Sequence, residues 1–114
     1  MNFAPLPSVD VAAVPSDGFV LDVREDNEWA AGHVEGALHI PMSDFVARFG
    51  ELTESVDDDR RVHVMCRVGG RSAQVTQYLV QQGVDAVNID GGMLAWDGSG
   101  RPIVTDSGDP AFVL

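Results

Sequence analysis

Short apolar runs alternate along this chain with segments of helical pattern, and this order constrains the fold more than any other feature of the sequence. Apolar runs predict strands at residues 19–23, 38–40, 61–66 and 86–89. Helices or helical turns are predicted at residues 25–31, 43–49, 71–82 and 91–96, with a further short helix after Ser8 or Asp10 and an acidic surface loop at 51–61. Such alternation is typical of an α/β fold with a mostly parallel central sheet and helices on both faces.

The bulk composition limits the organisation and the compartment of the chain. Its 114 residues suit a single domain. One cysteine cannot form an internal disulfide, which fits a reducing cytosol. Residues 1–20 lack the features of a signal peptide, and no apolar stretch has the length of a membrane span. We therefore expect a cytoplasmic protein with no membrane partner.

The charge distribution points to a small anionic ligand. The formal net charge of −11 argues against nucleic acid and anionic membranes as partners, because both need a basic face. All seven basic residues are arginine, and four of them lie within twelve positions: Arg60, Arg61, Arg67 and Arg71. The first two directly follow three aspartates at 57–59 and can instead balance their charge. The clearest basic site is thus the pair formed by Arg67 and Arg71.

A candidate nucleophile stands at the start of the segment Cys66-Arg67-Val68-Gly69-Gly70-Arg71-Ser72. The predicted strand ends at Cys66, and in a parallel sheet the ligand site lies at the carboxyl ends of the strands. The two glycines let the backbone turn so that successive N–H groups can surround an anion, beside the N-terminus of the next helix. Two arginines add positive charge, so we expect the pKa of the thiol to be lowered and the thiolate to be the nucleophile.

Two of these residues also have plainer interpretations. A lone cysteine at a strand end can be a small buried hydrophobe, although flanking arginines and glycines do not suit an inert core position. Ser72 can be the N-cap of the following helix, or its hydroxyl can donate to a bound anion. No cluster of His, Cys and Asp has the spacing of metal ligands, so we expect neither a metal nor another cofactor.

The same segment, residues 66–72, resembles the active-site loop of the single-domain rhodaneses, a family of thiosulfate and related sulfurtransferases. Three further segments resemble the family's other signatures in the same order: Leu21–Glu25, Gly32–Ala37 with Ile40-Pro41, and Gly91–Trp96. The resemblance covers a core of about residues 6–104 and leaves residues 105–114 as a C-terminal tail within a single domain, 1–114.

The resemblance implies a mechanism and a set of site residues. Cys66 would take a sulfane sulfur from thiosulfate or a persulfide donor, hold it as a persulfide, and pass it to cyanide, a thiol or a protein acceptor. The substrate-binding residues would be Arg67, Val68, Gly69, Gly70, Arg71 and Ser72. Since the chain has no second cysteine, the sulfur must be discharged onto another molecule. Asp22 and Arg24 would form a structural ion pair or help to shape the pocket, and His33 would make a hydrogen bond to the backbone.

Other functions remain open at this point. A cysteine-dependent phosphatase or arsenate reductase also holds a thiolate under backbone amides, but its loop has one residue more than the four that separate Cys66 from Arg71. A non-catalytic interaction or regulatory module of the same family typically lacks the cysteine or the arginines that are present here. The identity of the physiological donor and acceptor cannot be derived from these residues.

Overall fold

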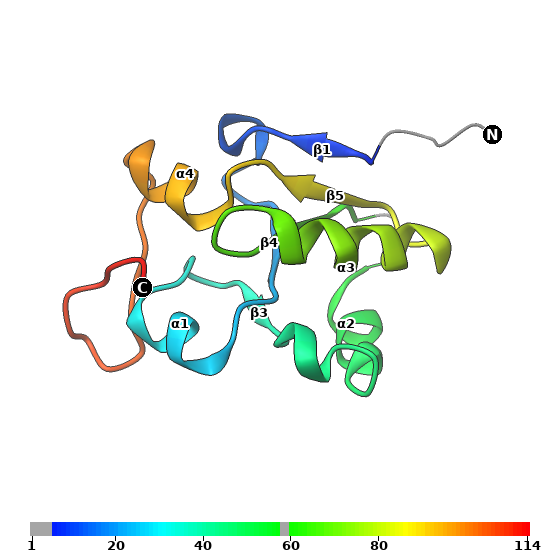
Figure 1. The fold of residues 1–114 in the computed structure, drawn as a ribbon, viewed down its shortest axis with the longest axis horizontal. Helices are drawn as coiled ribbons and strands as arrows, with labels where there is room; N and C mark the ends of the chain where they lie inside the picture. The colour runs from blue at the N-terminus through cyan, green and yellow to red at the C-terminus, as the bar shows by residue number, and fades with distance from the viewer. Residues whose placement is uncertain (1–5, 58–59) are drawn as a thin grey trace.

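Five short parallel strands organise the chain, as Figure 1 shows. The computed structural model describes residues 6–57 and 60–114. Within them the strands are β1 (Ser8–Val9), β2 (Phe19–Asp22), β3 (Leu38–His39), β4 (Val62–Met65) and β5 (Ala86–Ile89), and their order in the sheet is β1-β5-β4-β2-β3. Each neighbouring pair is parallel, which confirms the predicted sheet and places β4 at its centre.

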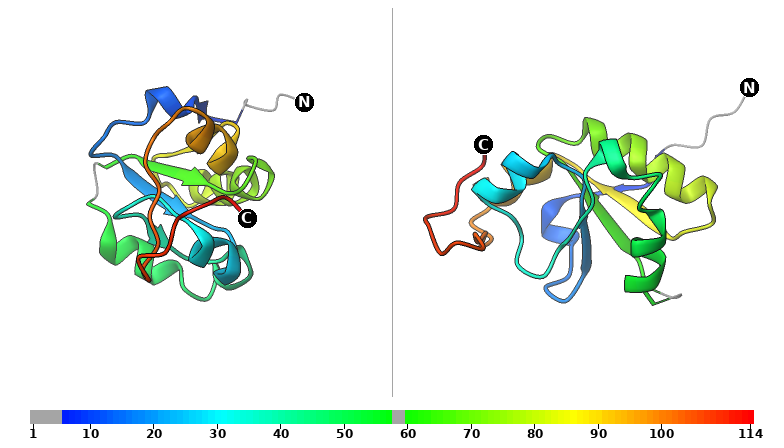
Figure 2. Two further views of the ribbon diagram at one scale, coloured as in Figure 1. Left: turned by 90° about the vertical axis from the view of Figure 1, so that its left-hand side faces the viewer. Right: turned by 90° about the horizontal axis from the view of Figure 1, so that it is seen from below.

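Helices cover both faces of this sheet (Figure 2), as predicted. The described segments comprise α1 (Asp26–Ala31), α2 (Phe49–Ser55), α3 (Gly70–Gln81) and α4 (Gly92–Gly98), with short 3-10 helices at Val11–Ala13 and Met42–Asp44. Successive side chains of a strand point to opposite faces. On β4, Val64 therefore joins a core cluster with residues of α2 and α3, whereas Met65 joins a second cluster with residues of α4. No helix in the described ranges is long and apolar enough to cross a membrane.

The helix expected at residues 43–49 was wrong in register. A 3-10 turn occupies Met42–Asp44, and α2 begins only at Phe49 and continues through Gly50, where the helix was expected to end. With this register Leu52 is completely buried, and the Phe49 ring makes edge-to-face contacts with Phe45 and Tyr78. Packing of these side chains outweighs the low helix propensity of one glycine, which costs about 1 kcal/mol.

The N-terminal segment contains a strand that the sequence did not predict. Only a 3-10 turn follows Asp10, and Ser8–Val9 instead pair with β5 as an edge strand. The N–H groups of Asn88 and Asp90 donate to main-chain oxygens of this segment at 2.8 Å. A two-residue strand is too short for the periodicity of its side chains to be recognised.

The C-terminal segment is loop, as expected, but it packs back against α1 (Figure 1). His33 and Val104 form an antiparallel bridge, and the Phe112 N–H donates to the Ala31 oxygen at 2.9 Å. The approach is so close that a Cβ on Gly32 would lie 2.6 Å from the Phe112 oxygen. The tail thereby reaches the edge of the sheet where the candidate site lies.

Candidate active site

Cys66 directly follows the central strand β4 and is buried, with 1% of its surface exposed. The chain then turns through Gly69, whose φ of +116° lies in the left-handed region that favours glycine, and enters α3 at Gly70. This is the predicted succession of strand, glycine turn and helix. Val68 is half exposed on the outer side of the loop.

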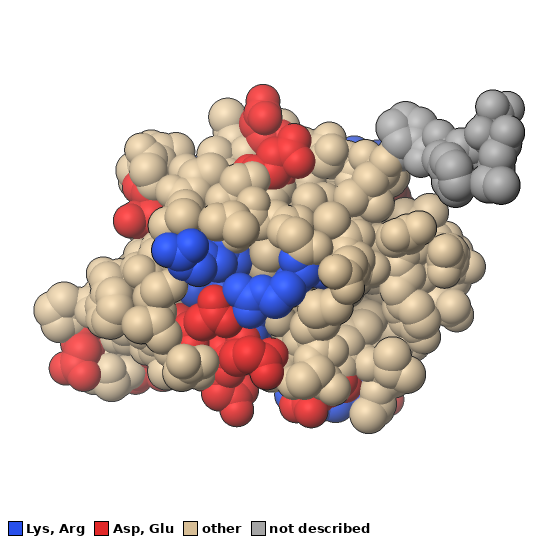
Figure 3. Space-filling model, in the orientation of Figure 1, with Lys and Arg blue, Asp and Glu red and all other residues tan. Residues whose placement is uncertain are grey.

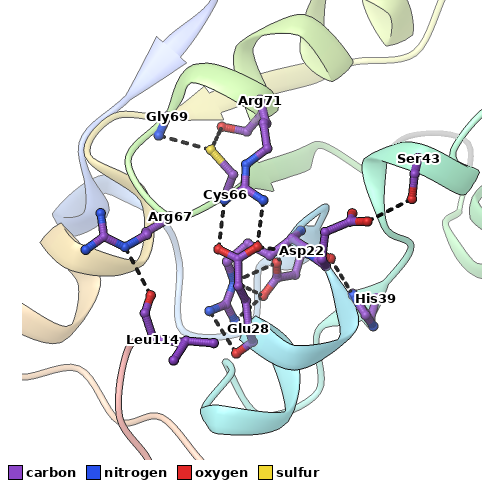
Figure 4. Close-up of polar contacts among 12 residues, drawn as sticks. Asp22, Glu28, His39, Ser43, Cys66, Arg67, Gly69, Arg71 and Leu114 are labelled. Atoms are coloured by element: carbon purple, nitrogen blue, oxygen red, sulfur yellow. Dashed lines mark hydrogen bonds and ion pairs between the residues drawn. The ribbon is translucent and has the colours of Figure 1, made fainter.

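Two donors of this loop point at the sulfur of Cys66. The Gly69 N–H lies 3.1 Å from Sγ, and the Ser72 hydroxyl donates to it at 3.3 Å (Figure 4). Ser72 is the third residue of α3 and is completely buried, so its interpretation as an N-cap was wrong; Gly69 holds that position. The hydroxyl instead faces the sulfur of Cys66.

The thiol is acidified chiefly by hydrogen bonds. Burial raises the pKa of Cys66, but the Ser72 hydroxyl and the backbone N–H groups of Ser72, Gly69 and Val68 outweigh burial and hold the pKa below its ordinary value. Hydrogen bonds to the charged form favour ionisation. The direction agrees with the sequence expectation, whereas the principal cause is the loop itself rather than the arginine charges.

Main-chain donors of α4 hold the loop from behind. The Met93 N–H donates to the Cys66 oxygen at 2.9 Å, and the Leu94 N–H donates to the Arg67 oxygen at 3.1 Å. These are N–H groups of the first turn of α4, which have no partner within the helix. A Cβ on Gly92, which has φ +53°, would lie 2.3 Å from the Cys66 oxygen. Gly92 therefore permits the close approach of α4 to the loop that these two hydrogen bonds require.

Asn88 on β5 supports the loop from a third side, and the sequence analysis missed it. Its Nδ2 donates to the Gly69 oxygen at 3.2 Å, so the Gly69 residue is held both at its N–H by sulfur and at its oxygen by the amide. The Asn88 Oδ1 is buried without a hydrogen-bond partner among the described atoms. The signal that could have identified it is its polar side chain within the otherwise apolar segment 86–89.

The predicted arginine cluster is not one cluster in space. Arg61, at the opposite end of β4 from Cys66, approaches Asp85 at 3.3 Å, and Arg60 donates to the Asp17 oxygen. Arg67, by contrast, lies in the loop before α3, and Arg71 lies in the first turn of that helix. On the face shown in Figure 3, basic surface over this loop meets acidic surface over α1. Only Arg67 and Arg71 therefore belong to the site.

Both of these arginines have partners that the sequence analysis did not foresee. The Arg71 guanidinium binds the Glu28 carboxylate of α1 through two hydrogen bonds, of 2.6 and 2.8 Å. The Arg67 Nε donates to the main-chain oxygen of Leu114 at 3.0 Å, and it is this contact that joins the tail to the loop (Figure 4).

Asp22 and Arg24 form the expected ion pair, fully buried at the end of β2. The shortest contact joins Arg24 Nη2 and Asp22 Oδ2 at 2.7 Å. The same guanidinium donates to the main-chain oxygens of Glu28 and Gly32, at 3.2 and 2.7 Å. The pair therefore fixes α1, and through α1 the carboxylate that meets Arg71.

His33 makes the predicted backbone hydrogen bond. Its Nδ1 donates to the Trp29 oxygen at 2.9 Å, and its ring stacks on the Trp29 indole at 3.6 Å. Across the described ranges, no group of three or more His, Cys, Asp or Glu side chains is arranged to hold a metal ion. The distinctive feature of the site is the Cys66 thiol, with a lowered pKa and two donors, the Gly69 N–H and the Ser72 hydroxyl, directed at its sulfur.

Comparison with known proteins agrees with this geometry. Residues 10–99 match the model of the rhodanese-like domain. The chain is 43% identical over 84 residues to "Putative sulfurtransferase YtwF" of Bacillus subtilis, covering 74% of this chain and 78% of that protein. It is 40% identical over 93 residues to a sulfurtransferase of Allochromatium vinosum, covering 81% and 83%. The crystal structure of a rhodanese-related protein from Thermoplasma volcanium superposes with a TM-score of 0.78 at 29% identity, covering 88% and 99%.

Proposed function

The chain belongs to the rhodanese family, and on this premise we propose that it is a sulfurtransferase whose Cys66 carries a sulfane sulfur as a persulfide. The observation that carries the proposal is the pair of donors, the Gly69 N–H and the Ser72 hydroxyl, aimed at one buried, acidified sulfur. A thiolate so placed is a prepared nucleophile, and the same donors can hold the charge of a persulfide.

With thiosulfate or a persulfide as donor and a thiol as acceptor, loading and discharge each exchange one sulfur–sulfur bond for another; with cyanide as acceptor, the outer S–S bond breaks and the C–S bond of thiocyanate forms. The Cys66 thiolate attacks the sulfane sulfur of the donor, a new S–S bond forms, and the donor's own bond breaks. The leaving group, sulfite from thiosulfate or a thiolate from a persulfide, departs with the electron pair. An acceptor thiolate then attacks the outer sulfur of the enzyme persulfide and regenerates the Cys66 thiolate.

The donor is a small anion or a low-molecular-weight persulfide, and a protein can serve as donor or acceptor. The chain supplies one cysteine, so the acceptor thiol must come from another molecule. The four residues between Cys66 and Arg71 make a tighter ring than that of the phosphatases, which suits a terminal sulfur better than a phosphate.

Intact mass spectrometry tests the proposal. Incubation with thiosulfate, mercaptopyruvate, glutathione persulfide, or a cysteine desulfurase with cysteine should add the mass of one sulfur atom to Cys66. Cyanide should remove it and release thiocyanate. The Cys66→Ser variant should fold normally, because the substitution is small. It should take up no sulfur, because it lacks the thiol. If no donor loads the native protein, the enzyme proposal is wrong and a non-catalytic interaction module is favoured.

A further inference from the structure

The ion pair between Arg71 and Glu28 changes the charge that an incoming donor meets. From the sequence, Arg71 should present a full positive charge to the site. In the folded chain, its two terminal nitrogens bind the two Glu28 oxygens, at 2.6 and 2.8 Å. Figure 4 shows the guanidinium pointing at this carboxylate. Bidentate pairs of this kind are among the stronger charged contacts. The pair presents little net charge to an anion at the thiol.

Glu28 is a fixed component of the site rather than a mobile surface carboxylate. Only 13% of its side chain is exposed. Its Oε1 also accepts a hydrogen bond from the Glu25 N–H at 3.1 Å, as part of the capping box of α1. The buried Arg24 holds the main chain of the same residue. An anion cannot take the place of this carboxylate without breaking several contacts at once.

The pair stays charged across the neutral range. The hydrogen bond from Arg71 lowers the pKa of Glu28 despite its partial burial, and the bond to Glu28 raises the pKa of Arg71. Asp26 adds a second acidic residue in the first turn of α1. Acidic surface therefore directly adjoins the basic surface of the loop (Figure 3).

We propose that Glu28 is a specificity-determining residue that makes the site discriminate against doubly charged sulfane donors and favour donors of lower negative charge. Thiosulfate, a dianion, should be selected against relative to thiosulfonates and persulfides. The inference rests on the proposed function for its sulfur chemistry. It also makes a prediction about the electrostatic potential at Cys66 that needs no sulfur transfer.

The first test measures that potential with two alkylating reagents, iodoacetate and iodoacetamide, which differ by one negative charge. Their ratio of alkylation rates at Cys66 cancels changes in thiolate content. Glu28→Gln removes the negative charge that binds Arg71 and keeps an oxygen for the Glu25 N–H. From Coulomb's law at intermediate effective dielectric, the iodoacetate-to-iodoacetamide ratio should rise about 3- to 10-fold.

A matched control exists on α2. Glu51 also accepts two hydrogen bonds from one guanidinium, from Arg48 Nε at 2.7 Å and Nη2 at 3.0 Å, but outside the site. Glu51→Gln makes the same change of charge and should leave the alkylation ratio unchanged. Arg71→Gln, which leaves Glu28 unpaired beside the thiol, should move the ratio in the opposite direction, below that of the native protein. Equal ratios in the native protein and in Glu28→Gln overturn the inference.

The second test compares thiosulfate with methanethiosulfonate, a monoanion that has a methyl group in place of one oxygen. Either donor gives its sulfane sulfur to the Cys66 thiolate, and sulfite or methanesulfinate leaves with the electron pair. Glu28→Gln should raise kcat/KM for thiosulfate about 3- to 10-fold more than for methanethiosulfonate. An unchanged preference between the two donors contradicts the role of Glu28.

The two proposals fail separately. If no donor loads Cys66 in the native protein, the sulfurtransferase proposal fails, while the alkylation ratio still tests the effect of Glu28. If sulfur transfer occurs and neither ratio responds to Glu28→Gln, the function stands and the specificity role is refuted. Thermal unfolding of each variant shows that the fold is retained.

Discussion

The hydroxyl of Ser72 offers the most direct test of how the loop activates its cysteine. It is buried on α3 and donates to the Cys66 sulfur at 3.3 Å. Burial raises the pKa of the thiol, and among the hydrogen bonds that lower this pKa the one from the Ser72 hydroxyl contributes most. Ser72→Ala removes this one donor and leaves the backbone donors in place. The thiolate should lose stability while the loop keeps its shape.

The size of the effect follows from the type of bond. A hydrogen bond to a charged partner contributes about 1.5–3 kcal/mol, and a long bond to sulfur belongs at the lower end of that range. A loss of about 1.4 kcal/mol corresponds to a tenfold change in the ionisation equilibrium. On the acidic side of its midpoint, the thiolate fraction of Cys66 in Ser72→Ala should fall about tenfold.

The assay is the rate of iodoacetamide alkylation as a function of pH, which reports on Cys66 alone because the chain has one cysteine. The midpoint should move to higher pH, while the plateau at high pH should be equal or slightly higher, since a more basic thiolate is the better nucleophile. Thr76→Val is the matched control. It removes a buried hydroxyl one turn later on α3 that bonds the Ser72 oxygen at 2.8 Å. A midpoint unchanged in Ser72→Ala, or shifted equally in Thr76→Val, would refute the assigned role.

The same bond makes stability depend on pH. The pKa of Cys66 is lower in the folded protein than in the unfolded chain, so its ionisation contributes stability above the unfolded pKa, and this contribution is lost as pH falls through the folded value. The difference in unfolding free energy between the native protein and Ser72→Ala should therefore grow as pH rises. Urea denaturation at neutral and alkaline pH measures it.

Three further substitutions test the supports of the loop. Gly92→Ala should displace the loop, since no side chain fits there at positive φ, and sulfur loading measured by mass should fall at least tenfold while the chain remains folded. Asn88→Ala should free the Gly69 oxygen, cost about 1 kcal/mol in urea denaturation and raise the alkylation midpoint; an unchanged midpoint contradicts its positioning role. Arg24→Leu should leave the Asp22 carboxylate buried without its partner and destabilise the fold by about 3–5 kcal/mol, whereas a loss below 1 kcal/mol in chemical denaturation would show that the pair is dispensable.

The sheet was predictable because its inner strands β2, β4 and β5 are short, mostly apolar segments. Residues 86–89 read as a strand without ambiguity, and the structure has β5 at those positions. The strand that ends before Cys66 and the helix that follows the glycines were equally clear. The register of α2 was not predictable, because it depends on the packing of Leu52 in the core rather than on the local pattern of apolar residues.

The position of Cys66 between a strand and a helix was also predictable, whereas its electrostatic setting was not. Cys66 and its loop are consecutive in sequence, so their chemistry is visible in one short motif. Glu28 lies 43 positions before Arg71, and Asn88 lies 19 positions after Gly69. Such contacts arise only when the sheet brings its carboxyl ends together. For this reason the sequence shows two arginines, while the folded site shows one of them neutralised.

The first turn of α4 holds the loop through main-chain hydrogen bonds. The groups that hold the Cys66 thiol are therefore independent of the side chains that the loop exposes. The main-chain hydrogen bonds require a glycine at 92 but place no demand on the side chains of Arg67 or Val68, which face outwards. A library randomised at those two positions should therefore retain an acidified thiol while its preference among partners changes. That outcome would show that the preference among partners can be changed without altering the groups that hold the Cys66 thiol.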